Sequence, residues 1–308
     1  MGIENRHDVV VIGGGPAGVS CALECLDVQL DTVLLEATSA VGGQVAEIPH
    51  SIRNVATGRF ENGAALAAAV QRSSTTLGEA VRLDQEVTSA NVQEGWVETP
   101  TGRFYAKALL IASGSARQEL SAAPDGAFGG DVTYQVESRP DRFDGRDVIV
   151  VGGGDSASLD ALELAETASS VRLVHRSEQL TARRDIIERI RRDARIEDLA
   201  GWEVESTNGS DHLEEVVLVR RATSERRVVA ARGIVVKISR SPRTSAFRAQ
   251  IELDGRGAVV VDGLLQTSCP GVFAAGDVVS GSYWRIATAL GQGVLAARSI
   301  LAHVEAAS

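Results

Sequence analysis

The sequence predicts an α/β protein made of two parallel-sheet domains, with the second inserted into the first. Two segments share one order of elements, an apolar strand, a glycine turn and a helix: DVVVIGGGPAGVSCALECL at 8–26 and DVIVVGGGDSASLDALELA at 147–165. Each leads into a second apolar strand, TVLLE at 32–36 and VRLVH at 171–175. Such units are right-handed crossovers of a parallel sheet. Their recurrence about 140 residues apart indicates an internal duplication.

Antiparallel strands follow each crossover unit. Residues 81–115 alternate apolar and polar side chains with turns at QEG and PTG, which predicts a β-meander that returns to the buried strand ALLIA. Residues 201–236 repeat this pattern, whereas GVFAAGDVV and a helix from about 286 to 304 have no counterpart in the second unit. We therefore expect two Rossmann-like dinucleotide-binding domains, each built as a three-layer ββα arrangement of two sheets and one layer of helices. The expected boundaries are residues 1–116 with 243–308 for the first domain, and residues 117–242 for the second.

Composition and charge limit the class of function. The 308 residues suffice for two domains that each have a core. A net charge of −10 argues against a nucleic acid or an anionic membrane as the main partner, and we interpret the acidity as solubility. No apolar run approaches the length of a membrane span, and the chain enters a core strand within eight residues without a secretory segment. We therefore expect a cytoplasmic protein with no membrane partner.

The three cysteines, Cys21, Cys25 and Cys269, do not form a disulfide framework. Cys21 and Cys25 are four residues apart on a predicted helix, a spacing too wide for a redox CxxC pair. Buried apolar packing is therefore the expected role of both. We assign no metal ligands.

The first glycine turn fits the GxGxxG pattern. Gly13 allows the tight turn, Gly15 lets the backbone approach a pyrophosphate, and Gly18 lets the helix pack on the strand. Glu36 ends the next strand, 18 residues past Gly18, where a carboxylate takes the ribose hydroxyls of a dinucleotide. A turn that follows a strand, opens a helix and has its acid in place predicts a dinucleotide site.

The second glycine turn fits the GxGxxA variant, with Gly152, Gly154 and Ala157. The strand that selects the cofactor ends in His175-Arg176 without an acid. An arginine there suits a 2′-phosphate, which favours NADPH over NADH. The alternative for His175 is a hydrogen-bonded histidine at a strand end.

These features together resemble the low-molecular-weight thioredoxin reductase family of FAD- and NAD(P)-dependent flavoproteins, from Asp8 to about Ala297. The matching blocks are VIGGGPAG (11–18), VGGQV (41–45), RNVATG (53–58), IASGS (111–115), VVGGGDSA (150–157), VHR (174–176) and PGVFAAGD (270–277). The resemblance implies FAD in the first domain, NAD(P)H in the second, and a homodimer.

The resemblance also implies the roles of individual residues. Asp277 binds the ribityl chain of FAD, Gln44 and Asn54 lie by the isoalloxazine ring, and the Ile286 amide faces the flavin O2, where the helix dipole stabilises charge. The residues expected at FAD are Gly13, Gly15, Pro16, Ala17, Gly18, Glu36, Gly43, Gln44, Asn54, Val87, Ala112, Gly114, Gly276, Asp277 and Ile286. Those expected at NAD(P) are Gly152, Gly154, Asp155, Ser156, Ala157, His175, Arg176 and Arg183.

The redox motif of the family is missing. Counted back from Gly152 without a gap, its CxxCD falls on QVESR at 135–139, so both sulfurs and the following acid are gone. A thiolate pair is essential to disulfide exchange, and we therefore expect that the chain is not a thioredoxin reductase. Gln135 and Ser138 would stand beside the flavin, either binding substrate or filling the vacated space.

Other departures lie near both cofactors. The family's HRRDxFRA becomes HRSEQLTA at 175–182, which loses two phosphate-binding arginines that Arg183 and Arg184 can replace, and Ser239 and Lys237 alter the following IGxxP segment. Near the flavin, Trp284 and Arg285 can line a substrate pocket as an aromatic wall and an anion clamp, or belong to an interface. His50 is a candidate proton donor or a surface-loop histidine.

Three functions are compatible with this pattern. In the first, hydride passes from NAD(P)H to FAD and on to a non-thiol acceptor such as ferredoxin, a quinone, oxygen or a small organic molecule. The segment FDGRDVIVVGGGDSA is similar to thioredoxin-reductase-like ferredoxin–NADP reductases. Those reductases usually carry a C-terminal extension that covers the flavin, whereas this chain stops at Ser308 straight after its last predicted helix. The second is an FAD-dependent oxidase that oxidises a small substrate directly and does not use NAD(P)H. The third is a non-catalytic flavoprotein.

Overall fold

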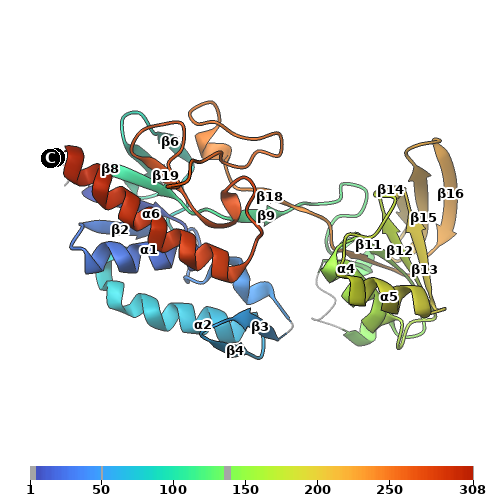
Figure 1. The fold of residues 1–308 in the computed structure, drawn as a ribbon. Helices are drawn as coiled ribbons and strands as arrows, with labels where there is room; N and C mark the ends of the chain where they lie inside the picture. The colour runs from blue at the N-terminus through green and yellow to red at the C-terminus, as the bar shows by residue number, and fades with distance from the viewer. Residues whose placement is uncertain (1–4, 50, 135–139, 308) are drawn as a thin grey trace. The chain divides into compact units, whose positions relative to one another are not determined.

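The computed structural model describes residues 5–49, 51–134 and 140–307. The chain forms two compact units: unit 1 comprises residues 1–116 and 241–308, and unit 2 comprises residues 117–240 (Figure 1). The chain passes from one unit to the other twice, through β9 (Ser115–Arg117) and β18 (Arg240–Pro242), which pair as a two-stranded sheet.

Unit 1 is built on a seven-stranded sheet in the order β5-β2-β1-β8-β7-β6, with β19 paired to β8. β1 lies parallel to both β2 and β8. The long strand β8 changes partner along its length: its first half pairs antiparallel with β7, and its second half pairs parallel with β19. The strands are β1 (Asn5–Ile12), β2 (Thr32–Leu35), β5 (Val81–Arg82), β6 (Ser89–Asn91), β7 (Trp96–Thr99), β8 (Gly102–Ile111) and β19 (Val272–Ala274).

One face of this sheet is covered by helices. α1 (Pro16–Asp27) and α6 (Ile286–Ala307) lie side by side on it (Figure 1). Alternate residues of β1 point to opposite faces: Val9 and Val11 pack with the helices, and Val10 packs in the cluster on the other face. Two layers of apolar side chains therefore enclose the sheet. The remaining elements of unit 1 are α2 (Gly63–Ser74), the pair β3 (Ile52–Val55) and β4 (Gly58–Phe60), and the 3₁₀ helices Gly43–Glu47, Thr75–Ala80, Ser245–Phe247 and Gly276–Val278.

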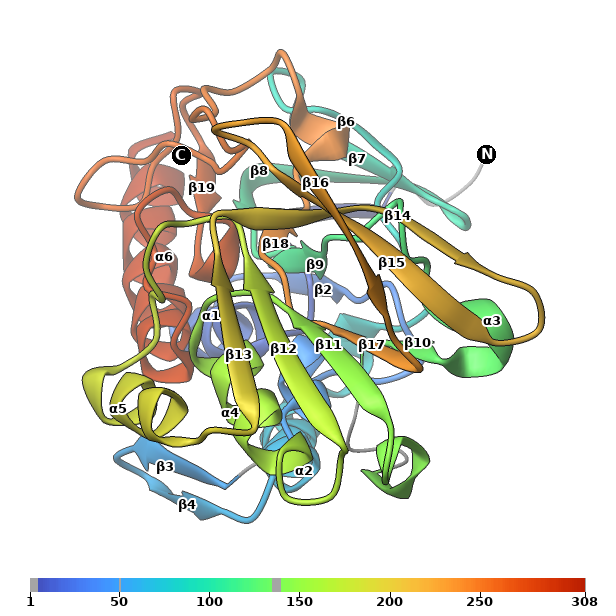
Figure 2. The same ribbon diagram turned by 90° about the vertical axis from the view of Figure 1, so that its right-hand side faces the viewer.

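Unit 2 repeats the layered plan. Its five-stranded sheet has the order β10-β17-β11-β12-β13, and every neighbouring pair is parallel (Figure 2). The strands are β10 (Val132–Thr133), β11 (Asp147–Val151), β12 (Ser170–His175), β13 (Ile196–Ala200) and β17 (Gly233–Val236).

The two faces of this sheet are covered by different layers. Helices α4 (Asp155–Leu164) and α5 (Arg184–Arg192) share a core with one face, where Val148 and Val150 point. Ile149 packs on the other face with the antiparallel sheet of β14 (Trp202–Gly209), β15 (Leu213–Arg220) and β16 (Glu225–Ala230). The short elements α3 (Ala127–Gly130) and the 3₁₀ helix Pro140–Phe143 complete the unit. The two Rossmann-like, three-layer domains expected from the sequence are thus confirmed.

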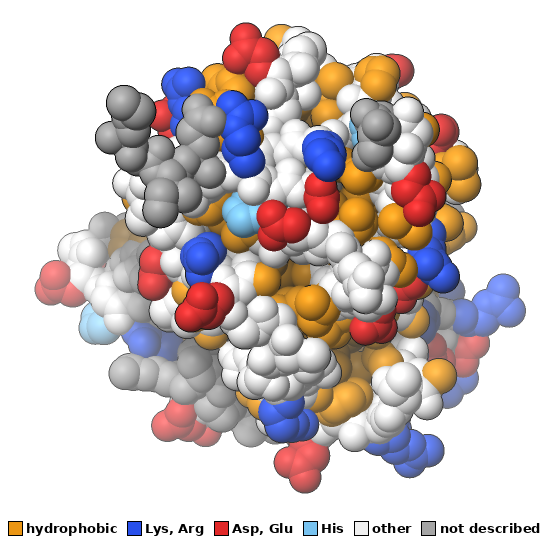
Figure 3. Space-filling model, turned by 90° about the vertical axis from the view of Figure 1, so that its left-hand side faces the viewer, with side chains coloured by type: hydrophobic (Ala, Val, Ile, Leu, Met, Phe, Trp, Pro, Cys, Tyr) orange, Lys and Arg blue, Asp and Glu red, His pale blue; other side chains and the backbone are white. Residues whose placement is uncertain are grey.

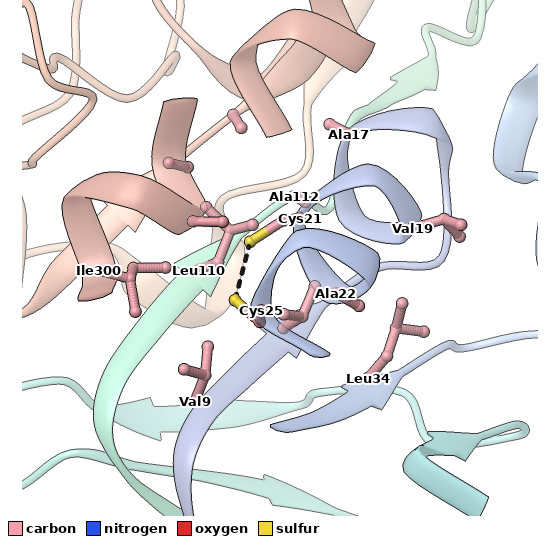
Figure 4. Close-up of a cluster of buried hydrophobic side chains, with 14 of the residues drawn as sticks. Val9, Ala17, Val19, Cys21, Ala22, Cys25, Leu34, Leu110, Ala112 and Ile300 are labelled. Carbon is pink, nitrogen blue, oxygen red and sulfur yellow. Dashed lines mark hydrogen bonds between the residues drawn. The ribbon is translucent and has the colours of Figure 1, made fainter. Parts of the chain in front are cut away.

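The three cysteines are free and buried. Cys21 and Cys25 lie on α1 among apolar side chains, with their sulfurs 3.8 Å apart (Figure 4). Within the described residues, no helix is both long enough and apolar enough to cross a membrane. On the face drawn in Figure 3, Lys and Arg side chains lie among Asp and Glu rather than in one patch.

Candidate functional site: two glycine turns and their surroundings

The first glycine turn connects β1 to α1, and two of its glycines cannot be replaced by any other residue. Gly13 has φ +107°, and a Cβ on it would lie 2.4 Å from the carbonyl oxygen of Ala112. A Cβ on Gly18 would lie 1.8 Å from the carbonyl oxygen of Gly13. Because backbone atoms occupy both positions, Gly13 and Gly18 are required by the fold itself.

Gly15 is different. Apart from its chain neighbours, no atom of the described residues lies within 4 Å of the place where its Cβ would be, and its φ of −73° suits any residue. It precedes α1, whose first turn receives no side-chain cap from the described residues and begins with Pro16. Open space and uncapped amides at a helix N-terminus form a cradle for a phosphate, so the residues present fit the pyrophosphate of a dinucleotide.

Glu36 lies beside this turn, as the sequence predicts. Its Oε2 accepts the Gly14 amide at 2.7 Å, and its Oε1 accepts the Thr38 amide at 2.9 Å and the Thr38 hydroxyl at 2.8 Å. The side chain is buried. These hydrogen bonds fix the carboxylate at the end of β2, where it can still accept ribose hydroxyls with its remaining lone pairs.

Gln44 and Asp277, both expected at FAD, are brought together by the fold. The Gln44 amide donates to Asp277 Oδ2 at 2.5 Å and to the Ser115 hydroxyl at 3.3 Å. Gly276 precedes Asp277, and a Cβ on it would lie 3.1 Å from Cβ of Ala17 in the first turn of α1. Its amide donates to Gln292 Oε1 of α6 at 2.8 Å. The PGVFAAGD segment is therefore seated directly against the start of α1.

The start of α6 is the third part of this site. Ile286 is its first residue, and the Arg285 carbonyl accepts the Ala289 amide at 3.0 Å. Tyr283 is 83% exposed and Trp284 has φ +49°, a conformation uncommon for a bulky residue. Arg285 is also exposed. A run of exposed aromatic and cationic side chains thus leads into the helix expected at the flavin.

The other residues expected at FAD are dispersed around this core. Gly43 has φ +58° and a Cβ on it would lie 3.0 Å from Cα of Gly15, so the two backbones are in close approach. Gly114 follows the buried Ala112 and accepts the Arg243 amide with its carbonyl at 3.0 Å. Asn54 is exposed on β3, and Val87 packs at the edge of the core on the other face of the sheet.

The second glycine turn, in unit 2, repeats the geometry of the first. Gly152 has φ +138°, and a Cβ on it would lie 2.2 Å from the Lys237 carbonyl oxygen and 3.1 Å from Cβ of Ala157. No described atom beyond its neighbours approaches within 4 Å of a Cβ on Gly154, and α4 has no side-chain cap from the described residues. Open space beside the glycine and uncapped amides at the helix start are thus present here as well, so these residues also fit a pyrophosphate.

The basic residues expected at a 2′-phosphate differ in how they are held. Arg183 precedes α5; its amide donates to Asp155 Oδ1 at 2.8 Å, and its Nε lies 3.6 Å from Asp155 Oδ2. Arg176, directly after β12, is exposed, as are Arg184 and Ser156. Arg176 and Arg184 are therefore both exposed to an anion, and Arg176 is the one that directly follows the strand.

His175 occupies in unit 2 the position that Glu36 has in unit 1. A Cβ on Gly153 would lie 3.1 Å from Cβ of His175, as one on Gly14 would meet Glu36. The ring is buried; Nε2 pairs with Asp198 Oδ1 at 2.7 Å, and Nδ1 lies 3.2 Å from the Ser177 hydroxyl. Both ring nitrogens therefore have protein partners, as the alternative of a hydrogen-bonded histidine at the strand end predicts.

Three expected catalytic residues, Gln135, Ser138 and His50, lie outside the described residues. Conversely, the sequence did not single out Ser115 or Gln292, which hold Gln44 and Gly276. Ser115 ends the matching block IASGS, and this position was a usable signal. Asp160, which forms an ion pair with Lys237 at 3.2 Å, gave no local signal, because only the fold shows that the two meet.

Comparison with known proteins places these features in a family. A family model described as pyridine nucleotide-disulphide oxidoreductase matches residues 7–293. A thioredoxin reductase of Peptoclostridium acidaminophilum is 30% identical over 99% of both chains, and a 34.2 kDa protein in the rubredoxin operon of Clostridium pasteurianum is 29% identical over 96% of both. The crystal structure of Lactococcus lactis thioredoxin reductase is similar with a TM-score of 0.83 and 27% identity, covering 97% of this chain and 99% of that one.

These matches contradict the expectation that the chain is not a thioredoxin reductase. That expectation rested on the few residues at 135–139, whereas the likeness to proteins named thioredoxin reductase extends over nearly the whole chain. A missing motif of five positions does not set a chain apart from relatives that share its fold and match it over nearly its whole length. The family and fold expected from the sequence are confirmed: the chain belongs to the pyridine nucleotide-disulphide oxidoreductase family, as a thioredoxin reductase-like flavoprotein.

Proposed function

We propose that this chain takes hydride from NAD(P)H in unit 2, passes it to FAD in unit 1, and delivers the electrons to a non-thiol acceptor. The observation that carries the proposal is the repeated glycine turn: Gly15 and Gly154 each stand at an uncapped helix start with open space in front. No atom of the described protein explains why these two positions are glycine. A bound pyrophosphate explains both.

The residues of unit 1 hold FAD, which when bound supplies a ring that accepts hydride and gives electrons to a second partner. The first turn of α1 binds the pyrophosphate, and Glu36 accepts the ribose hydroxyls. Asp277, oriented by Gln44, accepts hydrogen bonds from the ribityl hydroxyls. The start of α6 at Ile286 presents amide groups and the positive end of the helix dipole to the ring.

The residues of unit 2 hold the pyridine nucleotide and favour NADPH over NADH. Arg176 is exposed directly after β12, at the strand end that reads the adenosine ribose. Where an NAD-specific site has a carboxylate, this chain has His175, whose ring is bonded to Asp198. A phosphate beside Arg176 would meet a cation, and β12 itself ends without an acidic residue.

The proposal of a non-thiol acceptor rests on the positions of the cysteines. The chain has no cysteine between Cys25 and Cys269, and both Cys21 and Cys25 are buried within α1. Electrons therefore leave the flavin without a resident surface dithiol. The acceptor classes are a quinone, oxygen, a small organic molecule or an iron–sulfur protein, and the name of the clostridial relative adds rubredoxin to those worth testing.

Anaerobic stopped-flow spectroscopy tests the proposal. FAD-loaded protein is mixed with NADH or NADPH, the visible flavin band is followed, and oxygen, a quinone, ferredoxin, rubredoxin and oxidised thioredoxin are then added separately. We expect bleaching that is faster with NADPH and reoxidation by a non-thiol acceptor. A flavin that neither nucleotide bleaches contradicts the nucleotide step. Reoxidation by oxidised thioredoxin and by none of the other acceptors contradicts the proposal of a non-thiol acceptor.

A second candidate is an FAD-dependent oxidase that does not use NAD(P)H. Two residues expected at the nucleotide are already hydrogen-bonded within the protein, His175 to Asp198 and Arg183 to Asp155, and this favours a function that does not need the nucleotide. Calorimetry with NADPH distinguishes the two functions, because tight binding excludes the oxidase. We also expect a cytoplasmic protein and a homodimer, and light scattering on the FAD-loaded protein checks the oligomeric state.

A further inference from the structure

A nearly buried ion pair lies behind the second glycine turn. Lys237 Nζ is 3.2 Å from Asp160 Oδ2, and the two side chains are 16% and 1% exposed. Taking both charges out of water costs free energy that their attraction offsets only when the geometry is good, and an apolar pair is often as stable. The pair therefore calls for a reason other than stability.

The internal duplication supplies a comparison within the same chain. In unit 1 the carbonyl beneath the glycine turn belongs to Ala112, as the one in unit 2 belongs to Lys237. Cys21 follows Gly18 by three residues, as Asp160 follows Ala157. Cys21 and Ala112 belong to one apolar cluster (Figure 4). The same turn is thus built with an apolar pair in unit 1, and the fold does not require the charges.

The backbone of Lys237 lies at the edge where an open α/β sheet binds its ligand. In unit 2, β12 and β13 are on one side of β11, and β17 and β10 are on the other. The strand order reverses between β11 and β17, and ligands bind in the crevice at the carboxyl ends of strands at such a point. Gly152 follows β11 and Lys237 follows β17, with the Lys237 amide donating to the Val151 carbonyl at 2.8 Å.

We propose that the Lys237 ammonium, positioned by Asp160, binds the nicotinamide-bearing half of NAD(P)H in unit 2. This rests on the proposed use of NAD(P)H. The adenosine half lies over β12, where Arg176 is exposed, so the other half of a dinucleotide crosses the switch point to the β17 side. Of the two charged side chains, the lysine is the more accessible.

The chemistry suits that half of the ligand. An ammonium group has three donors, so it can keep its contact with Asp160 and also donate to the carboxamide oxygen or a ribose hydroxyl. Its positive charge is compatible with the neutral reduced ring and unfavourable to the cationic oxidised ring. Lys237 therefore favours NADPH over NADP⁺, and Asp160, which is too buried to reach the ligand, is a positioning residue.

The experiment separates the two halves of the ligand by calorimetry on the FAD-loaded chain. The probes are 2′,5′-ADP for the adenosine half, and NADPH and NADP⁺ for the whole. The variants are Lys237→Met and the double variant Lys237→Met/Asp160→Leu, which copies the apolar character of unit 1 and avoids leaving Asp160 buried without its cation. The control is Lys107→Met, because Lys107 is the other lysine of the chain and lies in unit 1, 53% exposed beside Asp8.

We expect the double variant to bind 2′,5′-ADP as the wild type does, and NADPH about tenfold to a hundredfold more weakly, the worth of a hydrogen bond to a charged group. The loss should be smaller for NADP⁺, a signature that a merely structural role would not produce. Unchanged NADPH affinity overturns the inference, and so does an equal loss of 2′,5′-ADP affinity. If the wild type binds neither 2′,5′-ADP nor NADPH, the proposed use of NAD(P)H fails, and this inference fails with it.

Discussion

The side-chain amide of Gln44 donates a hydrogen bond to Asp277 Oδ2 at 2.5 Å, although 233 residues separate the two in the chain. Gln44 belongs to the 3₁₀ helix Gly43–Glu47 and Asp277 to the 3₁₀ helix Gly276–Val278. The bond joins the first part of unit 1 to the part that follows the inserted unit 2. It also leaves the carboxylate with a fixed orientation and spare lone pairs beside the first glycine turn.

Replacing Asp277 by alanine should weaken FAD binding about tenfold to a hundredfold, because a hydrogen bond to a charged group is lost. The measurement is the dissociation constant of FAD from the reconstituted apoprotein, followed by flavin fluorescence. Asp27→Ala, at the exposed end of α1, is the control and should leave FAD affinity unchanged. Full FAD affinity in the Asp277 variant would show that this carboxylate does not contact the cofactor.

Two glycines of the first turn should respond to alanine in opposite ways. Gly18→Ala places a Cβ 1.8 Å from the Gly13 carbonyl oxygen, so it should destabilise the apoprotein by about 2 kcal/mol or more. Gly15→Ala meets no described atom within 4 Å and should change apoprotein stability by less than about 0.5 kcal/mol while weakening FAD binding. Urea unfolding of both apoproteins, with FAD titration of the folded ones, checks this. Normal FAD affinity in the Gly15 variant would contradict the pyrophosphate cradle.

Asp254 should make the stability of unit 1 depend on acid pH. The Ser280 hydroxyl donates to its Oδ2 at 2.7 Å, and this bond, with the amides of Arg256 and Ala258, lowers the pKa of Asp254 below its usual value of 3.8. A carboxyl with a lowered folded pKa contributes stability above its unfolded pKa and loses that contribution as pH falls through the folded pKa.

Ser280→Ala should therefore cost about 1 kcal/mol of unfolding free energy at neutral pH and progressively less below about pH 4. Urea unfolding of wild type and variant across this range is the measurement. Ser73→Ala is the control and should give a difference independent of pH, because the Ser73 hydroxyl donates to an uncharged group, the carbonyl of Ala69 in α2. A Ser280 variant whose cost is constant down to acid pH would show that the bond does not set this pKa.

The buried cysteines should take no part in electron transfer. All three thiols are buried. The hydrogen bond between Cys21 and Cys25 raises the pKa of Cys21 and lowers that of Cys25, and burial raises the pKa of Cys269. A thiol reagent should therefore react with the native protein only at the rate of unfolding. The variant Cys21→Ala/Cys25→Ala/Cys269→Ala should retain NADPH-dependent flavin reduction and turnover with each acceptor that the wild type uses. Loss of one acceptor in a variant that still folds would implicate these sulfurs.

Arg176 should set the preference for NADPH. Arg176→Ala removes the exposed guanidinium at the end of β12 and should weaken NADPH binding about tenfold without a change for NADH. Arg191→Ala, on the exposed side of α5, is the control for loss of one positive charge. Calorimetry with both nucleotides checks the prediction, and an equal loss for NADH and NADPH would place Arg176 away from the 2′-phosphate.

The sequence by itself determined the plan of this protein. The two glycine turns, their strands and their helices could be predicted because their causes are local: a positive φ at Gly13 and Gly152, and alternation of buried residues along the strands. The position of Glu36 followed for the same reason, since one helix and two strands of fixed length bring it back to the turn. The expectation that the chain is not a thioredoxin reductase was wrong, because it rested on the few residues at 135–139 rather than on the whole chain.

Only the tertiary structure decided which side chains meet. Gln44 reaches Asp277, His175 is bonded to Asp198, and Lys237 is paired with Asp160. Each pair joins elements that are neighbours in space but not in sequence, and its geometry depends on how helices and strands pack rather than on a local period. For this reason the sequence identified His175 as a nucleotide-site candidate, and the packing of β12 against β13 showed that its ring is already bonded.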